Sequence, residues 1–228
     1  MSRIGTLDLL AEVEENLEAI KNMEIKPVKV KSILEHLRSA LEYVANDTYD
    51  KYADKSSTPR PKISFPYGEK KFIDSFFIKK LNIPVPTSSP LYEIFNSIQE
   101  YRTGDGWLTM MCNLTNEVKH RNPIPLDEEE YIKEIEINVD GVALIRADSQ
   151  SSIIFENNYV NGIKMEDIAY ENGKIERSGN GKPINITFTN DKKIRFHGHD
   201  YEVIPFIALC HEKIKEFVQK SYDELNKL

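Results

Sequence analysis

Apolar residues recur at helical spacing through the first half of the chain, which predicts a bundle of helices over residues 1–125 with short connections. The helices are expected over about 6–22, about 27–53, in a short stretch after Gly68, from Ser89-Pro90 to Tyr101, and over 107–121. Thr6 and Ser89 are expected to be N-caps, since a hydroxyl oxygen can accept a hydrogen bond from a free amide at a helix start. Segment 55–67 contains three prolines and is expected to be extended.

From Tyr131 onward the pattern changes from helical spacing to alternation, which predicts a small, mostly antiparallel sheet. The strands are expected at 132–139 and 142–145, joined by a turn at Asp140-Gly141, and then at 153–155, 184–188 and 193–196, with a turn over 189–192. The acidic run 127–130 is expected to be a solvated linker or helix end. Pro205 begins a closing helix that runs to Leu225. Its apolar positions extend beyond one narrow stripe, so it should also pack on the bundle.

The expected fold class is therefore α+β, with a helical bundle, then an antiparallel sheet region, then a long C-terminal helix. The expected organisation is a helical domain over 1–125 and a region over 126–228 that contains the sheet and the closing helix.

The segment from Trp107 to Pro125 combines an apolar stripe with a crowded polar face. At about 100° per residue, Trp107, Met111, Leu114 and Val118 share one face, which leaves the opposite polar face displayed to solvent. The candidate binding residues on that face and in the last turn are Asn113, Asn116, Glu117, Lys119, His120 and Arg121. The basic residues also suit a helix end, where cations complement the exposed carbonyl groups. The polar face is therefore a binding site or an interface, and its basic end is equally consistent with a simple helix cap.

Composition indicates an ordinary globular protein. The chain has 228 residues, of which 40% are hydrophobic and 29% are charged. No run approaches the roughly 20 apolar residues that span a bilayer, and glutamates interrupt the first twenty residues, which therefore lack a signal core. We expect a cytoplasmic protein without membrane association. Cys112 and Cys210 are expected to be free, half-buried thiols.

Charge and motifs exclude several classes of function. The net charge is −7, and although residues 46–124 carry +2, only short lysine pairs and the 119–121 cluster are basic, which argues against nonspecific duplex binding. The chain lacks the glycine-rich phosphate loop, the H-E-x-x-H motif and the G-x-S-x-G motif, so kinase-like, zinc-protease and serine-hydrolase functions have no support, and no cofactor is expected. His197 and His199 are weak metal candidates, because no further ligand follows at suitable spacing and Arg195 disfavours a cation.

Several short motifs carry a resemblance over roughly residues 30–125. They are R-S-A-L-E-Y-V-A from Arg38, the loop Phe65-Pro66-Tyr67, I-Q-E-Y from Ile98, and N-E-V-K-H-R from Asn116. In these motifs the chain resembles bacterial proteins of uncharacterised function that contain a HEPN-like helical bundle. The resemblance implies an association with RNA metabolism or intracellular defence, and a dimer. It also implies RNA, a nucleotide or a protein as the partner.

Many proteins with this bundle are metal-independent ribonucleases that carry an R-x(4–6)-H motif, and this chain departs from that motif because no histidine follows an arginine at that distance. We therefore expect a non-catalytic binding or accessory protein. The alternative is an endoribonuclease in which His120, Arg121 and Arg38 are brought together in space. A structural role is open for Arg38 as well, because its stem can pack on the apolar stripe while its head pairs with Glu42, four residues later.

Overall fold

The computed structural model describes residues 2–21, 25–52, 60–118, 123–139, 142–148, 150–171 and 174–228. It contains both helices and strands and ends in a long C-terminal helix. The chain forms two compact units. A helical unit comprises residues 1–126 and 195–228, and a sheet unit comprises residues 127–194.

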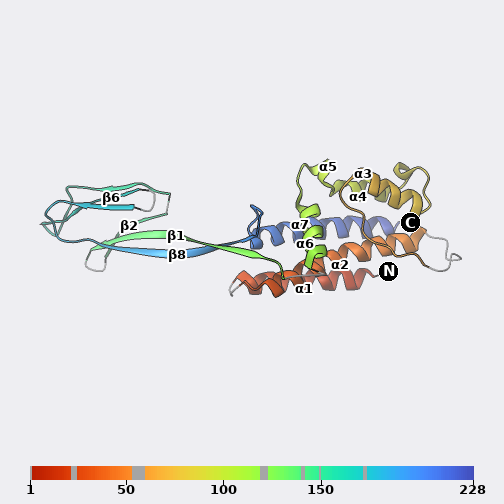
Figure 1. Cartoon of the computed structure of the whole chain (residues 1–228), viewed down its shortest axis with the longest axis horizontal. Coiled ribbons are helices and arrows are strands. Elements are labelled where there is room, and N and C mark those ends of the chain that lie inside the picture. Colours follow the sequence, from red (N-terminus) through yellow and green to blue (C-terminus); the bar gives the residue numbers. More distant parts are fainter. Residues whose placement is uncertain are drawn as a thin grey trace. The chain divides into compact units, whose positions relative to one another are not determined.

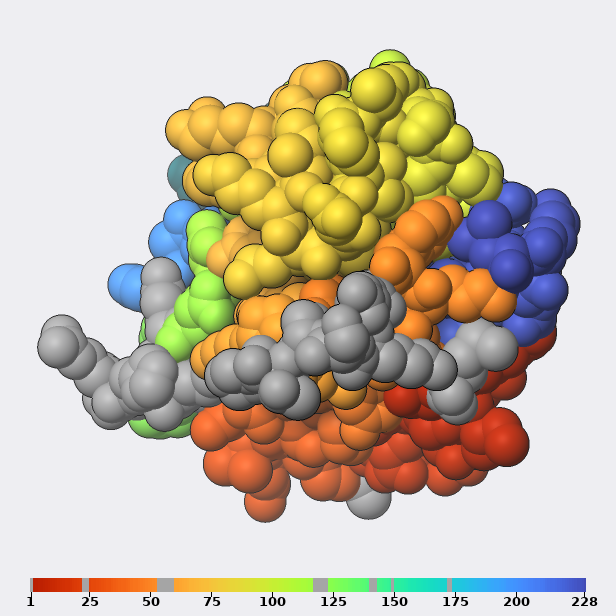
Figure 2. Space-filling model, turned by 90° about the vertical axis from the view of Figure 1, so that its right-hand side faces the viewer, coloured from red at the N-terminus to blue at the C-terminus, as the bar shows by residue number. Residues whose placement is uncertain are grey.

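Three long helices form the body of the helical unit: α1 (Arg3–Lys21), α2 (Pro27–Tyr52) and α7 (Val203–Leu225). They pack against one another in the lower right part of Figure 1. The shorter elements are α3 (Lys70–Ser75), the π-helical turn η1 (Phe76–Lys80), the 3-10 turn η2 (Pro86–Ser88), α4 (Pro90–Ser97), α5 (Glu100–Thr103) and α6 (Trp107–Val118). Figure 2 shows residues 60–100, gold to yellow, gathered in one layer on one side of the orange α2, with the red α1 on the other side.

The closing helix α7 is part of the helical core. It packs on α1, α2, α4 and α6, and Phe206, Ile214, Phe217 and Tyr222 are all at most 1% exposed. The prediction that the closing helix packs on the bundle is confirmed. Residues 195–228 form one unit with the bundle, so the predicted division into 1–125 and 126–228 differs from the observed one. The reason is that the apolar face of α7 is complementary to helices that lie far from it in the sequence.

The N-cap predicted at Thr6 is wrong, and the N-cap predicted at Ser89 is confirmed in position but not in its hydrogen bond. Helix α1 begins at Arg3, so Thr6 lies inside it, where its buried hydroxyl is 2.9 Å from the Tyr222 hydroxyl on α7. Ser89 does occupy the N-cap position of α4, but its side chain makes no cap hydrogen bond and lies 3.0 Å from the Tyr52 hydroxyl. In both cases a tertiary partner takes the hydroxyl group that a local cap would use.

The single helix predicted from Pro90 to Tyr101 is broken in two. Helix α4 ends at Ser97, and Gln99 adopts an extended backbone conformation before α5 begins at Glu100. The side chain of Gln99 is fully buried and hydrogen-bonded to the neighbouring 66–68 loop. The apolar spacing in the sequence continues from Ile98 to Tyr101, although Tyr101 is 40% exposed and α5 contains no buried residue, so the pattern alone does not reveal the break.

The sheet unit is built from two three-stranded sheets and a hairpin. Its strands are β1 (Leu126–Val139), β2 (Val142–Ala147), β3 (Ile153–Phe155), β4 (Tyr159–Val160), β5 (Ile163–Lys164), β6 (Asp167–Glu171), β7 (Lys174–Ser178) and β8 (Asn185–Phe196). The strand orders are β2-β1-β8 and β3-β6-β7, and β4 pairs with β5. Strands β1 and β2 pair antiparallel around the predicted Asp140-Gly141 turn, which itself lies outside the described residues.

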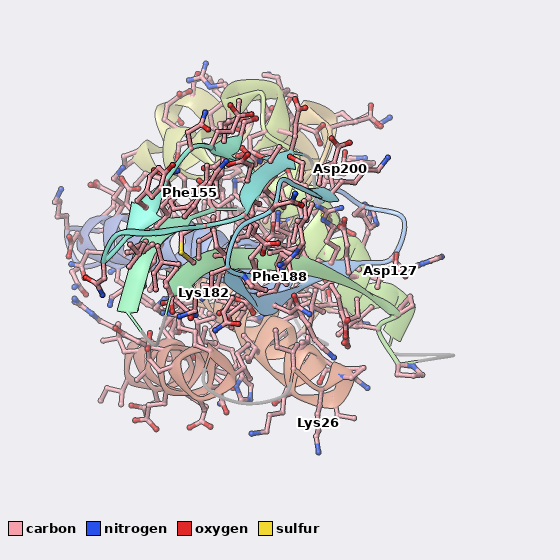
Figure 3. The ribbon with its side chains drawn as sticks, turned by 90° about the vertical axis from the view of Figure 1, so that its left-hand side faces the viewer. Lys26, Asp127, Phe155, Lys182, Phe188 and Asp200 are labelled. Carbon is pink, nitrogen blue, oxygen red and sulfur yellow. The ribbon has the colours of Figure 1, made fainter. Side chains whose placement is uncertain are left out.

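Side chains from both sheets meet in a separate apolar core that includes Ile135, Met165, Ile168 and Tyr170. Phe155 and Phe188, both labelled in Figure 3, differ in role: Phe155 is 9% exposed in this core, whereas Phe188 is 39% exposed.

The strand predictions were incomplete in the sheet unit. Strand β1 includes the acidic run 127–130, which was expected to be a linker or a helix end, because it is paired in a sheet with β8. Strand β8 is continuous through the predicted turn at 189–192, where Asp191 pairs with Lys133 at 3.1 Å and Lys192 pairs with Glu128. Strands β4 to β7 were not predicted. Ion pairs between β1 and β8 stabilise these two polar strands, and the alternation of apolar residues in the sequence does not reveal such pairs.

The chain leaves the helical unit after Leu126 and returns to it at Arg195, and residues next to these two points are hydrogen-bonded to each other. The amide of His197 donates a hydrogen bond to the carbonyl of Pro125 at 3.1 Å. Within the described part of the chain, no helix combines the length and the apolar character that a membrane span requires.

Replacing residues 127–194 with a short glycine-serine linker should leave the helical unit folded, because Pro125 and His197 already hold its two ends together. Residues 1–125 alone should instead aggregate or lose cooperative melting. They lack α7, each of whose buried aromatics contributes about 2 kcal/mol in transfer free energy. Circular dichroism melting of the linker variant and of residues 1–125 distinguishes the two cases. A cooperative melt for 1–125, together with an unfolded linker variant, would contradict this division of the chain.

Candidate functional site

The loop Phe65 to Gly68 is the point at which the short motifs of the sequence meet. Its backbone is anchored at both ends. The amide of Phe65 donates to Glu42 Oε2 on α2 at 2.7 Å, and the amide of Gly68 donates to Gln99 Oε1 at 3.1 Å. Gln99 Nε2 donates to the carbonyl of Pro66 at 3.3 Å. Side chains from α2 and from the α4–α5 junction therefore fix the loop on both sides.

The ring of Phe65 inserts into an aromatic cluster in the core. It stacks on Phe95 of α4 at a centroid distance of 5.3 Å and meets Phe217 of α7 edge-on at 5.4 Å. Offset-stacked and edge-on pairs of this kind stabilise beyond simple burial. The loop is thus held by its side chain as well as by its backbone.

Arg38 lies beside this loop, on α2. Its Nε donates to Glu42 Oε1 at 2.9 Å, and its guanidinium carbon is 4.8 Å from the centre of the Tyr67 ring. The expected pairing of Arg38 with Glu42 is confirmed. The residue is 9% exposed, and its Nη1 has no hydrogen-bond partner among the described residues. Burial by itself lowers the pKa of Arg38, but the nearby Cys112, Glu42 and Tyr67 outweigh burial and raise that pKa, so the group stays charged.

The polar face of α6 adjoins the same loop. Asn116 Nδ2 donates to the Tyr67 hydroxyl at 2.9 Å, which links α6 to the ring that Arg38 covers. Asn113 and Asn116 are exposed, while Trp107, Met111 and Leu114 are buried on the opposite side, as the spacing predicted. We call the surface formed by Tyr67, Asn113 and Asn116 the amide face.

The remaining sequence candidates on this face are not placed. Lys119, His120 and Arg121 lie outside the described residues, as does the side chain of Glu117. The structure therefore brings Arg38 over the Tyr67 ring and Asn116 to the Tyr67 hydroxyl, and it does not test whether His120 or Arg121 joins them. Sequence reasoning did not assign Tyr67 or Gln99 to this site. Both lie in the short motifs on which the resemblance to HEPN-like proteins rests, and their place in those motifs is the sequence signal that could have identified them.

Cys112 is the one thiol that contacts this network among the described residues. It is fully buried, not half-buried as expected, and burial raises its pKa to about 12. The nearby Arg38 opposes this shift without overcoming it. A thiol with so high a pKa is protonated at neutral pH and is not a nucleophile. Cys210 on α7 is also free and fully buried, and burial again raises its pKa.

None of the described histidines is among the residues that form the amide face. His211 Nε2 lies 3.1 Å from the carbonyl of Leu10, and burial lowers the pKa of this imidazole. His197 and His199 lie in the turn that follows β8. Within the described ranges, neither belongs to a group of three or more residues that could hold a metal ion.

The chemistry available to the described site is recognition. Exposed amides donate and accept hydrogen bonds but do not transfer protons at neutral pH. The only charged groups in the described network, Arg38 and Glu42, already neutralise each other. General acid–base catalysis needs a titrating group within hydrogen-bond reach of the reacting atoms. Among the described residues of this face the one such group is the Tyr67 hydroxyl, which already accepts a hydrogen bond from Asn116.

Comparisons with known proteins found no relative of this chain. No protein-family model matches the chain, and neither the curated proteins nor the solved structures contain a significant match.

Glu42→Ala should lower the free energy of unfolding by about 3 kcal/mol or more, because it leaves a buried arginine without its partner and frees the amide of Phe65. Glu93→Ala is the matched control. Its pair with Arg102 is 2.8 Å long, close to the 2.9 Å of the Arg38–Glu42 pair, but both of its side chains are more than half exposed. Such exposed pairs contribute at most about 1 kcal/mol. Urea unfolding of the two variants measures the difference. Equal losses would show that Glu42 does not anchor the loop.

The stability of the protein should fall as pH rises above 9. The unfolded chain releases the Cys112 proton near its ordinary pKa of 9.0, whereas the folded chain retains it up to about 12. The stabilising contribution of the neutral thiol is therefore complete below pH 9 and is lost between these two values. Urea unfolding between about pH 8 and about pH 11 should show a steeper decline for the native sequence than for Cys112→Ala. Identical pH slopes would contradict the raised pKa.

Proposed function

We propose that this protein is a non-catalytic, HEPN-like accessory protein of the bacterial cytoplasm that binds single-stranded RNA through the amide face. The observation that carries the proposal is the pair of exposed amides, Asn113 and Asn116, beside the Tyr67 ring, in a network whose charged groups are already paired.

The chemistry of the face favours single-stranded RNA over a duplex. Unpaired bases present their hydrogen-bonding edges, and amide side chains can both donate to and accept from these edges. Duplex binding depends mainly on many phosphate contacts by cations, and the described part of the amide face offers no exposed cation. Residues from three other short motifs, Glu42, Gln99 and Asn116, all hydrogen-bond to the Phe65–Gly68 loop. This shared contact supports the HEPN-like assignment, because the motifs that carry the resemblance lie together in the fold.

Binding should be measured by fluorescence anisotropy with a labelled single-stranded RNA and a duplex of the same sequence. Asn113→Ala/Asn116→Ala should weaken single-strand binding by at least about tenfold, the order expected for losing base contacts. The control is Asn16→Ala, which removes a half-buried amide on α1 that hydrogen-bonds to Glu12, and this variant should bind like the native protein. If the native protein does not bind single-stranded RNA at high micromolar concentration, or if the control weakens equally, the proposal fails.

The alternative, a metal-independent endoribonuclease, is tested on the same samples. We expect single-stranded RNA to remain intact in the presence of a chelator, because Arg38 is committed to Glu42. Cleavage that leaves cyclic phosphate ends, and that is lost in folded His120→Ala and Arg38→Ala variants, would establish the enzyme instead. The resemblance also implies a dimer, and sedimentation equilibrium measures that state directly.

A further inference from the structure

A cavity of about 350 Å³ lies between the extended segment that precedes the Phe65–Gly68 loop and the helix pair α3–η1. It contains no residue of the amide face, although Pro66 in its wall directly precedes Tyr67 in the chain. The residues that define its character are Lys62, Ser64, Pro66, Phe72, Phe76 and Lys80.

Local backbone geometry explains why these side chains meet. In the extended segment, Ile63 and Phe65 are buried, and Lys62 and Ser64 are exposed on the other side, as alternation along extended backbone requires. Phe72 and Phe76 are four residues apart, so they share one face of the helix pair.

The second wall is completed by a π-helical turn. The amide of Leu81 donates to the carbonyl of Phe76 at 3.1 Å, which is the wider hydrogen-bond spacing of a π-helix. This turn carries Lys80 at the edge of the cavity. Single π-helical turns are uncommon and occur frequently at functional sites.

The cavity lies in the basic part of an acidic protein. Residues 60–81 contain six basic and two acidic side chains, whereas the whole chain has a net charge of −7. Lys70 and Lys71 are paired with Asp74 and Glu69. By contrast, neither of the cavity's own lysines, Lys62 and Lys80, forms an ion pair with another described residue. Two ammonium groups are thus available to an anion in the cavity.

Aromatic surface complements this charge. The Phe72 side chain is 48% exposed although it is large and apolar, and Phe76 lies deeper at 5%. Aromatic rings bind other flat rings by stacking. The volume is at the lower end of the range for small-molecule sites, which is about 300 to 1,000 Å³, so it suits a single ring system with a small charged group.

We propose that this cavity binds a small aromatic anion, in which a flat ring packs on Phe72 and Phe76 and a phosphate or carboxylate group is held by Lys62 and Lys80. The hydroxyl of Ser64 supplies a hydrogen-bond donor to the same anionic group. The anion could be supplied by a nucleoside monophosphate or by an aromatic carboxylate, and these sources are separated experimentally.

Isothermal titration calorimetry of the full chain should use adenosine monophosphate, indole-3-carboxylate, adenosine and inorganic phosphate as probes. At least one of the two aromatic anions should bind at least about tenfold more tightly than adenosine or phosphate, since each of these lacks half of the recognised chemistry. Adenosine monophosphate alone would identify the phosphate source, and indole-3-carboxylate alone would identify the carboxylate source. No binding by either, or equal binding by adenosine, overturns the proposal.

Variants then assign the binding to the cavity. Lys80→Ala and Phe72→Ala should each weaken the tighter aromatic anion by at least about fivefold, while Lys79→Ala, which removes the same charge next to the cavity, should not. These side chains are exposed, so the variants should fold, and circular dichroism melting verifies this. If Lys79→Ala weakens binding as much as Lys80→Ala, the anion is attracted only by the overall positive charge of this region, and the assigned site is wrong.

Discussion

The carboxylate of Glu42 is the group on which the described site depends. One of its oxygens accepts from Arg38 and the other accepts from the amide of Phe65. A carboxylate and a guanidinium that are largely removed from water are tolerated when they pair and when their remaining hydrogen-bonding groups find partners. Because the same carboxylate also binds the loop backbone, the position of the loop is tied to the position of the ion pair.

The consequences of this anchor extend in two directions. Inward, it directs the Phe65 ring onto Phe95 and Phe217, which connects α2 to α4 and α7. Outward, it places Tyr67 under Arg38 and within hydrogen-bond distance of Asn116 on α6. One carboxylate thus links the packing of the bundle to the geometry of its exposed polar surface. A binding surface that rests on a rigid core in this way is pre-organised, which reduces the entropy cost of binding.

The two proposed sites differ in chemistry, and the difference follows from which groups remain unpaired. On the amide face the described charges neutralise each other and uncharged amides are left to recognise a ligand. In the cavity beside α3 and η1, apolar rings meet ammonium groups that form no ion pair with another described residue, which suits a ligand with complementary parts. The sheet unit has its own core and shares neither site.

Helical periodicity in the sequence was sufficient to predict α2, α6 and α7, because each buries a regular apolar stripe and the burial of that stripe is what stabilises it. The pairing of Arg38 with Glu42 was also predictable, since residues four apart on a helix are neighbours. Other features depended on partners that are distant in the sequence. The break at Gln99 exists because the 66–68 loop binds that side chain, and Thr6 is inside α1 because Tyr222 lies 216 residues later and takes its hydroxyl.

The sheet unit shows the same division. Paired apolar alternation predicted β1 and β2, but the continuity of β8 and the inclusion of the acidic run in β1 depend on ion pairs between strands. One part of the candidate site could be predicted from the sequence and the other could not. The sequence indicated that the polar face of α6 would be exposed, because its opposite face is apolar. Only the tertiary structure determined that the Phe65–Gly68 loop would lie beside that face, where Tyr67 accepts from Asn116. The loop is held there by its own backbone amides, which donate to Glu42 and Gln99, and backbone amides are the same in every sequence.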